Sequence, residues 1–440
     1  MRRTSSAIVL MASLLVAACS GSGGGTAAPG ATTASEAPGA SSPAASGESP
    51  GASTSAATGF DAQSVSGDLT LQGWSAGAVE APILEKVLED FQAKYPNIKV
   101  KFEPISGNYV DAMAPKFSSQ DVPDVFYVDS SQAATWIDDG VLEPLDDYVA
   151  KSGFDTSKFY PGYLDAFKGP DGKLYGLPKD GNTLAMAYNT DLLQKAGVTA
   201  PPTDWASLTD AVAKLKSSGV DTPLCLGPSL DRALAFIYAG GGSLYNADMT
   251  AAAIDSPESV AAINEYLGFF KDGNAKAPKA LGDDWCGKSL GEQHAAIIFE
   301  GGWLDPFMKE NYADVKYQWA EMPAGPAGKA TLGFTVAYSM GVDSKNKDAS
   351  WVLISYLTGP EGMNTWTEGG VANPSRSDLQ GGEGKEILIQ GADYAKPWAF
   401  VPGFSKVNDA FNNAFTAAIQ GDGSAEDIAT ATKAAIDASQ

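Results

Sequence analysis

The sequence predicts an α/β fold of two lobes, and three observations lead to this prediction. About 370 residues follow a low-complexity N-terminal stretch, more than a single hydrophobic core usually serves. Within this part the spacing of apolar residues changes repeatedly between the strand period of 2 and the helical period of about 3.6. No internal repeat interrupts this alternation. We therefore expect parallel strands joined by helices.

The first elements form a strand, helix and strand in sequence. Apolar and polar residues alternate over 68–74, which is typical of a half-buried strand. Over 83–95 the apolar residues instead recur at helical spacing, and Pro96 then ends the helix. The alternation returns over 98–103, so a second strand is expected there.

Later elements follow the same scheme. The final one is the clearest, because Val407, Phe411, Phe415 and Ile419 form one stripe at a spacing of four. Its aromatic residues are therefore expected in the core. The same reasoning predicts helices at 109–119, 130–138, 351–357 and 405–419 and strands at 125–128 and 295–299.

The first residues, 1–18, are typical of an export signal. Arg2 and Arg3 precede an apolar run over 7–16, which is too short to span a bilayer as a mature helix. The letters LVAAC end at Cys19 and resemble the lipobox of bacterial lipoproteins, in which this cysteine is lipidated and becomes the new N-terminus. The alternative is an ordinary cleaved signal followed by an incidental cysteine.

Residues 19–66 are expected to form a disordered tether. After Cys19 the stretch consists almost entirely of Ser, Gly, Ala, Thr and Pro. Such a composition buries too little apolar surface to offset the conformational entropy lost on folding. The lipid on Cys19 would then be the only contact with a membrane, and the tether would hold the folded part away from it.

Charge and composition exclude several classes of function. The formal net charge is -23, whereas nucleic acids and anionic lipids require a basic surface. The chain has one histidine, His294, and three cysteines, so the usual zinc sites and a histidine-based catalytic triad lack their residues. We expect no metal and no cofactor, and His294 to be structural or on the surface.

Two cysteines, Cys225 and Cys286, remain beyond Cys19. In an exported protein an isolated pair indicates a disulfide. Two unpaired buried thiols are the alternative.

Several short strings, in their order along the chain, resemble the extracellular solute-binding protein family 1, whose best-known member is the maltose-binding protein. No single string is decisive, but together they cover nearly all of the chain after the tether. They are FQAKYPNIKV (91–100), PDVFYVD (123–129), GVLEPLDDY (140–148), DGKLYGLP (171–178), AYNTDLLQKAG (187–197), PPTDW (201–205), FEGGW (299–303) and SWVLISYLTGPEG (350–362).

This resemblance implies a two-lobe periplasmic-binding-protein fold with hinge strands. Carried onto this sequence, lobe 1 holds 67–179 and 332–372, and lobe 2 holds 180–331 and 373–440. The implied function is capture of a carbohydrate in the cleft between the lobes by hinge closure, for delivery to the permease subunits of an ABC importer. The protein is expected to be a monomer anchored outside the cytoplasm.

A sugar site needs flat aromatic rings for the apolar sugar faces and polar groups for the hydroxyls. Trp303 is the leading candidate, because the Trp of this G-x-W pattern stacks on the ligand in the resembling family. Trp74, after the first strand, and Trp398, in a loop rich in Pro and Gly, are further candidate rings, with core packing as the alternative for Trp74. Phe334 opens a strand near a later hinge crossing.

Four polar residues complete the candidate site. Asp129 and Ser130 follow a strand, and Asp129 is equally suited to cap the next helix. Asn182 lies at the first hinge crossing, where the maltodextrin binders carry an acidic residue; nearby Asp180 is a substitute. Arg376 could donate to two hydroxyls or pair with an acidic neighbour.

Three other functions remain open at this level. An exported glycoside hydrolase would need two carboxylates, and acidic residues are plentiful, although no nucleophile elbow or metal motif is present. The same fold could bind an amino acid, a polyamine or a phosphorylated polyol. A surface adhesin or a receptor for a sensor kinase is the third alternative.

Overall fold

The computed structural model of the chain describes residues 60–74, 80–119, 121–368, 370, 372–398 and 400–439. The predicted signal at 1–18, the lipidation at Cys19 and residues 19–59 of the predicted tether lie outside these residues. The predicted disorder is wrong for 60–66, because Phe60, Ala62 and Val65 pack against the hydrophobic core of the first sheet.

The first sheet has the strand order β11-β10-β3-β1-β2. In addition, β4 pairs with β10 along the edge opposite β3. β1 runs parallel to β2 and β3, whereas β10 runs antiparallel to β3 and β4. The strands are β1 (Gly67–Trp74), β2 (Ile98–Ile105), β3 (Val125–Asp129), β4 (Leu177–Thr183), β10 (Thr331–Met340) and β11 (Ala395–Pro397).

The second sheet has the order β7-β6-β8-β5-β9. Its long pairings are antiparallel, with β5 between β8 and β9. Only Leu184 separates β4 of the first sheet from β5 of the second. The strands are β5 (Ala185–Asn189), β6 (Leu224–Cys225), β7 (Ala275–Lys276), β8 (Ile297–Glu300) and β9 (Tyr317–Ala320).

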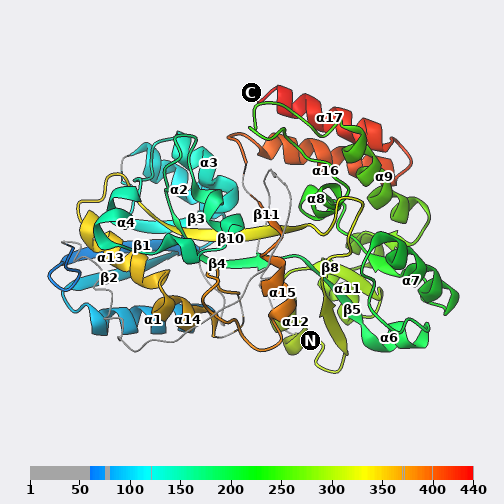
Figure 1. Cartoon of the computed structure of the whole chain (residues 1–440), viewed down its shortest axis with the longest axis horizontal. Coiled ribbons are helices and arrows are strands. Elements are labelled where there is room, and N and C mark those ends of the chain that lie inside the picture. The colour runs from blue at the N-terminus through cyan, green and yellow to red at the C-terminus, as the bar shows by residue number, and fades with distance from the viewer. Residues whose placement is uncertain are drawn as a thin grey trace, which may run out of the picture.

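Helices surround both sheets and give the molecule two lobes (Figure 1). Around the first sheet lie α1 (Glu80–Lys94), α2 (Tyr109–Ser118), α3 (Ser130–Asp138), α4 (Asp146–Ser152), α5 (Pro161–Leu164), α13 (Lys347–Leu357) and α14 (Pro360–Thr367). The others are α6 (Thr190–Lys195), α7 (Trp205–Ser217), α8 (Leu230–Ala239), α9 (Pro257–Lys271), α10 (Pro278–Leu281), α11 (Cys286–Gly291), α12 (Leu304–Asn311), α15 (Glu386–Gly391), α16 (Ser405–Ile419) and α17 (Ala425–Asp437).

Each sheet has its own hydrophobic core. The first core includes Leu71, Phe126 and Trp351, and a second, larger core includes Phe236 and Phe411. The predicted helix over 405–419 is confirmed, and Val407, Phe411 and Phe415 are buried as expected.

The chain passes between the two sheets at β4 and at β10. Leu177 of β4 belongs to the first core, and Leu184 directly after β4 belongs to the second. β10 repeats this pattern, since Leu332 packs in the second core and Ala337 in the first. These two adjacent strands form the connection between the lobes seen at the centre of Figure 1. The lobe boundaries at 179/180, 331/332 and 372/373 stay a prediction.

A disulfide joins Cys225, the last residue of β6, to Cys286, the first residue of α11. Both cysteines are buried beside β8, together with Leu290 and Ile298. The bond therefore ties α11 to β6 of the second sheet.

Replacing both cysteines by Ala should lower the free energy of unfolding by roughly 4 kcal/mol, because the bond closes a loop with a sequence separation of 61. Urea unfolding of the oxidised wild type, the reduced wild type and the double variant would measure this. Reduction alone should reproduce most of the loss. Equal midpoints for all three proteins would contradict the expectation.

Candidate functional site

One face of the first sheet gathers several predicted site residues. Residues directly opposite each other in an antiparallel ladder project from the same face. Phe334 of β10 lies opposite Asn182 of β4, while Val336 lies opposite both Asp180 and Asp129. The side chains of these residues therefore point to the same side of the sheet, close to where the chain passes between the lobes.

A buried ion pair lies at this crossing. The Nζ atom of Lys179 is 2.5 Å from Oδ2 of Asp180, and the indole Nε1–H of Trp366 donates to the same carboxylate oxygen at 2.8 Å. The ammonium also lies 3.7 Å from the centre of the Trp366 ring. Because Lys179 is only 3 % exposed, these contacts supply the stabilisation that water would otherwise provide.

Trp74 adjoins this ion pair through Tyr127. It is the last residue of β1, and its ring lies 5.0 Å from that of Tyr127 and 5.5 Å from that of Tyr109, both in edge-on geometry. The Nζ atom of Lys179 is in turn 5.3 Å from the Tyr127 ring. Trp74 is only partly buried, so it stays a candidate ring beside the Lys179–Asp180 ion pair.

Asp129 caps α3, and Ser130 makes a long-range contact. The Oδ1 atom of Asp129 accepts from the backbone N–H of Ser131 at 2.9 Å. Burial raises the pKa of Asp129, and the hydrogen bonds from Ser131 oppose that rise. The Ser130 hydroxyl donates to the backbone carbonyl of Trp398 at 2.8 Å. This bond links the start of α3 to the segment that follows β11.

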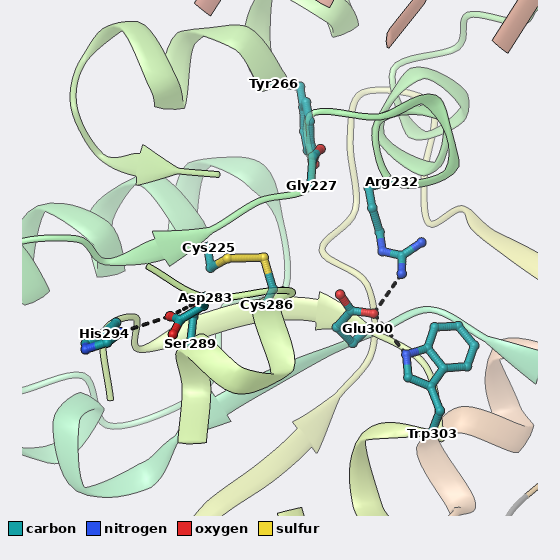
Figure 2. The surroundings of a disulfide bond; sticks show 10 residues. All are labelled: Cys225, Gly227, Arg232, Tyr266, Asp283, Cys286, Ser289, His294, Glu300 and Trp303. Atoms are coloured by element: carbon teal, nitrogen blue, oxygen red, sulfur yellow. Dashed lines mark hydrogen bonds and ion pairs between the residues drawn. A yellow bond between two sulfur atoms is a disulfide. The ribbon is translucent and has the colours of Figure 1, made fainter. Parts of the chain in front are cut away.

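Trp303 comes from the other lobe and is held at the end of β8 (Figure 2). Its Nε1–H donates to Oε2 of Glu300 at 3.1 Å, and Nη2 of Arg232 lies 2.8 Å from the same oxygen. Gly301 lets the ring lie on the backbone, because a Cβ at that position would be 2.4 Å from Cζ3 of Trp303. Gly302 likewise allows close approach of Asn182, whose Oδ1 would be 2.7 Å from a Cβ there.

Trp303, Phe334 and Trp398 form one set of contacting rings, here called the aromatic group. The ring centres of Trp303 and Phe334 are 5.9 Å apart, and those of Phe334 and Trp398 are 5.6 Å apart. Trp303 and Phe334 are partly buried, whereas Trp398 is only 1 % exposed. Within the described part of the chain, the indole N–H of Trp398 has no hydrogen-bond partner.

Trp398 therefore supports the aromatic group from the core in this conformation and has no open face. The Pro and Gly content of its surroundings predicted a loop, and Trp398 does follow β11 outside any helix. It packs against Phe400 at a ring distance of 5.3 Å. Its role as a stacking ring stays a prediction.

Arg376 is not brought to this group. Its Nε and Nη2 donate to the two carboxylate oxygens of Asp378 at 2.9 and 2.8 Å. The guanidinium carbon also lies 5.3 Å from the ring of Phe159 and 5.9 Å from that of Phe154. The structure thus shows the pairing with an acidic neighbour, which was the alternative expectation for Arg376.

A second buried lysine joins α12 to the start of α15. The Lys385 ammonium pairs with Asp305 and donates to the carbonyl of Gly302 at 3.2 Å. Asp305 also accepts from the Tyr317 hydroxyl at 2.5 Å and the Trp319 indole N–H at 2.8 Å. The Asp305 carboxylate thus accepts from three donors.

Sequence reasoning missed several residues of the site, namely Lys179, Arg232, Trp366 and Lys385. Trp366 lies in α14 without a loop signal, and only folding brings it to Asp180. Glu300 belongs to the FEGGW string (299–303) but was not predicted as a site residue. An acidic residue at the end of a wholly apolar strand was the one signal available, since such a buried charge needs a partner.

The one histidine of the chain lies beside an aspartate. His294 is partly exposed, and its Nδ1 lies 2.9 Å from Asp283, which also accepts from Ser289 at 2.8 Å (Figure 2). Within the described residues no cluster of His, Cys, Asp or Glu could hold a metal ion. In the same part of the chain, no helix is long and apolar enough to cross a membrane.

Comparison with known proteins identifies the family. The model of the bacterial extracellular solute-binding proteins matches residues 76–364. The chain belongs to this family. Members are extracytoplasmic, and the two-lobe fold described above is that of such binding proteins.

Three similar proteins illustrate the relationship. A Brucella abortus binding protein is 25% identical over 394 residues, covering 85% of this chain and 93% of its own. The solved structure of a Listeria monocytogenes ABC substrate-binding protein in complex with cycloalternan has a TM-score of 0.73 at 23% identity, with 84% of this chain and 98% of that chain covered. A Rhizobium meliloti sn-glycerol-3-phosphate-binding periplasmic protein is 28% identical over 169 residues, 36% of this chain and 38% of its own.

Asp129→Asn should raise the free energy of unfolding relative to the wild type, and this gain should be larger at about pH 8 than at about pH 4. Burial raises the pKa of Asp129 in the folded state, so its favourable protonated form is lost as the pH rises through that folded value. Asn keeps the helix cap and does not titrate. Urea unfolding at the two pH values measures the difference.

Asp155→Asn serves as the control with the opposite sign. Asp155 also caps a short helix, but the hydrogen bonds from Ser157 lower its pKa. That variant should therefore lose stability relative to the wild type as the pH rises. The same pH trend in both variants would contradict the assignment for Asp129.

Proposed function

We propose that this solute-binding protein captures an uncharged carbohydrate between its lobes and delivers it to the permease subunits of an ABC importer. The observation that carries the proposal is the contact of Trp303, from the second lobe, with Phe334 on the site face of the first sheet. Both rings are only partly buried, so each has surface to offer a sugar's C–H face.

Polar groups for the hydroxyls lie next to these rings. Asn182 projects from the same face as Phe334 and lies against Gly302. Asp129 and Asp180 project from that face two residues further along the ladder, opposite Val336. An amide and carboxylates beside aromatic rings match the alternating polar rim and apolar face of a sugar.

The charges around the site favour a neutral ligand over a phosphorylated one. Three cations lie near it, and each is paired: Lys179 with Asp180, Arg232 with Asp231 and Glu300, and Lys385 with Asp305. A phosphate would have to displace these carboxylates or approach them with a like charge. Glu80 adds a further carboxyl near Lys179, and burial raises its pKa.

The relatives offer two ligand classes. The Listeria protein of similar fold is bound to an oligosaccharide, whereas the partly matching Rhizobium protein binds sn-glycerol 3-phosphate. The paired cations are the reason for preferring the first class. A glycerol phosphate remains the second candidate because that relative's match, though short, is the more identical.

We also propose that the mature protein is a monomer anchored by a lipid on Cys19 and without enzymatic activity. Residues 19–59 would form the tether, because Phe60, Ala62 and Val65 pack against the first core. The signal and lipobox letters support the anchor. Absence of turnover is checked by incubating the protein with the oligosaccharides below and analysing the products.

A thermal-shift screen of the domain from Phe60 onward, the first described residue, should identify the ligand class. The panel holds maltose, maltotriose, a cyclic oligosaccharide and monosaccharides, with sn-glycerol 3-phosphate, spermidine and amino acids alongside. A ligand at about 100 times its Kd should add roughly 2.7 kcal/mol of stability. We expect a sugar to raise the Tm, and a rise with sn-glycerol 3-phosphate alone would replace the sugar by a phosphorylated polyol.

Trp303→Ala should weaken binding of the sugar identified in this screen by at least about 1 kcal/mol, as expected when a central aromatic anchor is removed. Isothermal calorimetry measures the loss. Trp285→Ala is the matched control. Trp285 is also partly buried, lies on a glycine and meets a phenylalanine edge-on, at 4.8 Å from Phe307, but it lies outside the aromatic group. Equal affinity losses in both variants would remove Trp303 from the site.

A further inference from the structure

Glu300 is a buried carboxylate with two donors. It ends β8 and is only 4 % exposed. Its Oε2 atom receives both the Trp303 indole N–H at 3.1 Å and the Arg232 guanidinium at 2.8 Å (Figure 2). Arg232 comes from the first turn of α8 and also pairs with Asp231. A buried charge with this set of partners is tied to one position, because leaving any of them unpaired is costly.

The Trp303 ring is held on other sides as well. The glycine at 301 leaves the backbone open for the six-membered ring, since a Cβ there would be 2.5 Å from Cη2. The guanidinium carbon of Arg232 lies 5.7 Å from the ring centre, and Phe334 meets the ring at 76°. The hydrogen bond to Glu300 fixes the N–H edge of the indole, so the orientation of the ring depends on this carboxylate.

We propose that Glu300, backed by Arg232, is a positioning residue that sets the orientation of the Trp303 indole before a ligand arrives. The inference rests on the proposed function, in which Trp303 stacks on a sugar. A ring already fixed in its bound orientation loses little rotational freedom on binding, so the fixed geometry contributes to affinity without a contact between Glu300 and the ligand.

The orientation is tested first without any ligand. The chain has nine tryptophans, so indole ¹⁵N–¹H spectra of the labelled protein give a resolvable set of signals, and Trp303→Phe identifies the signal of Trp303. Glu300→Ala should shift that signal and speed its exchange with solvent. Glu300→Gln keeps an oxygen that can accept from the indole but loses the ion pair, and it should give an intermediate effect.

Glu292→Gln is the matched control for these spectra. Glu292 lies in the same lobe and accepts from the Tyr312 hydroxyl at 2.8 Å, without contact to an indole N–H. It should leave the Trp303 signal unchanged. An unchanged Trp303 signal in Glu300→Ala would overturn the proposal, whether or not any sugar binds.

The second test measures affinity for maltotriose, or for the panel sugar with the larger thermal shift, by calorimetry. Glu300→Ala should weaken binding about tenfold in the wild-type background and have little effect in the Trp303→Phe background, because a residue that acts through Trp303 is coupled to it. Equal losses in the two backgrounds would mean that Glu300 acts on the fold and would overturn the proposal.

Gly301→Ala provides an independent disturbance if Glu300→Ala folds poorly. The added Cβ would displace the indole while leaving Glu300 and Arg232 in place. It should shift the Trp303 signal and weaken binding as Glu300→Ala does. Normal affinity despite a displaced ring would contradict the link between orientation and binding. If no compound of the panel binds, the proposed function fails, and the ligand-free spectra still decide whether Glu300 orients Trp303.

Discussion

The pairing of β4 with β10 is the constraint on which the rest of the structure depends. Both strands run from one hydrophobic core into the other, so a single antiparallel ladder carries the connection between the lobes. The Tyr163 ring packs behind this ladder, where a Cβ on Gly181 would be 2.3 Å from Cε2 of the ring. With that face filled, Asn182 and Phe334 project from the opposite face, towards Trp303.

Periodicity made much of the fold predictable from the sequence. The helix at 130–138 and the helix at 405–419 have the predicted bounds, because both carry clear stripes and the first has a capping residue at Asp129. The first helix begins at Glu80 and not near residue 83, and β8 begins two residues later than expected. Such boundaries depend on tertiary packing, which periodicity does not report.

The candidate site was less predictable, because its contacts join residues far apart in sequence. The G-x-W letters were sufficient to choose Trp303, but nothing local indicates that Trp366 reaches Asp180 from a position 186 residues away. Trp398 and Arg376 show the converse. Both were candidate ligand contacts, but in the folded chain Trp398 is buried against Phe334 and Arg376 is paired with Asp378. Loop composition reports backbone conformation, while burial depends on what packs above it.

The place of β10 in the first sheet also affects the order in which the protein can fold. β10 lies between β3 and β4, yet it is synthesised only after the whole segment that forms the second sheet. Val336 pairs with Asp129, although more than half of the residues of the folded part lie between them in the sequence. Pairings of such high contact order form slowly, because loop-closure entropy is lost before the contacts form. The first lobe therefore cannot complete its sheet during early synthesis. The edge of β3 that pairs with β10 stays unpaired for longer than it would in a protein whose neighbouring strands are close in sequence.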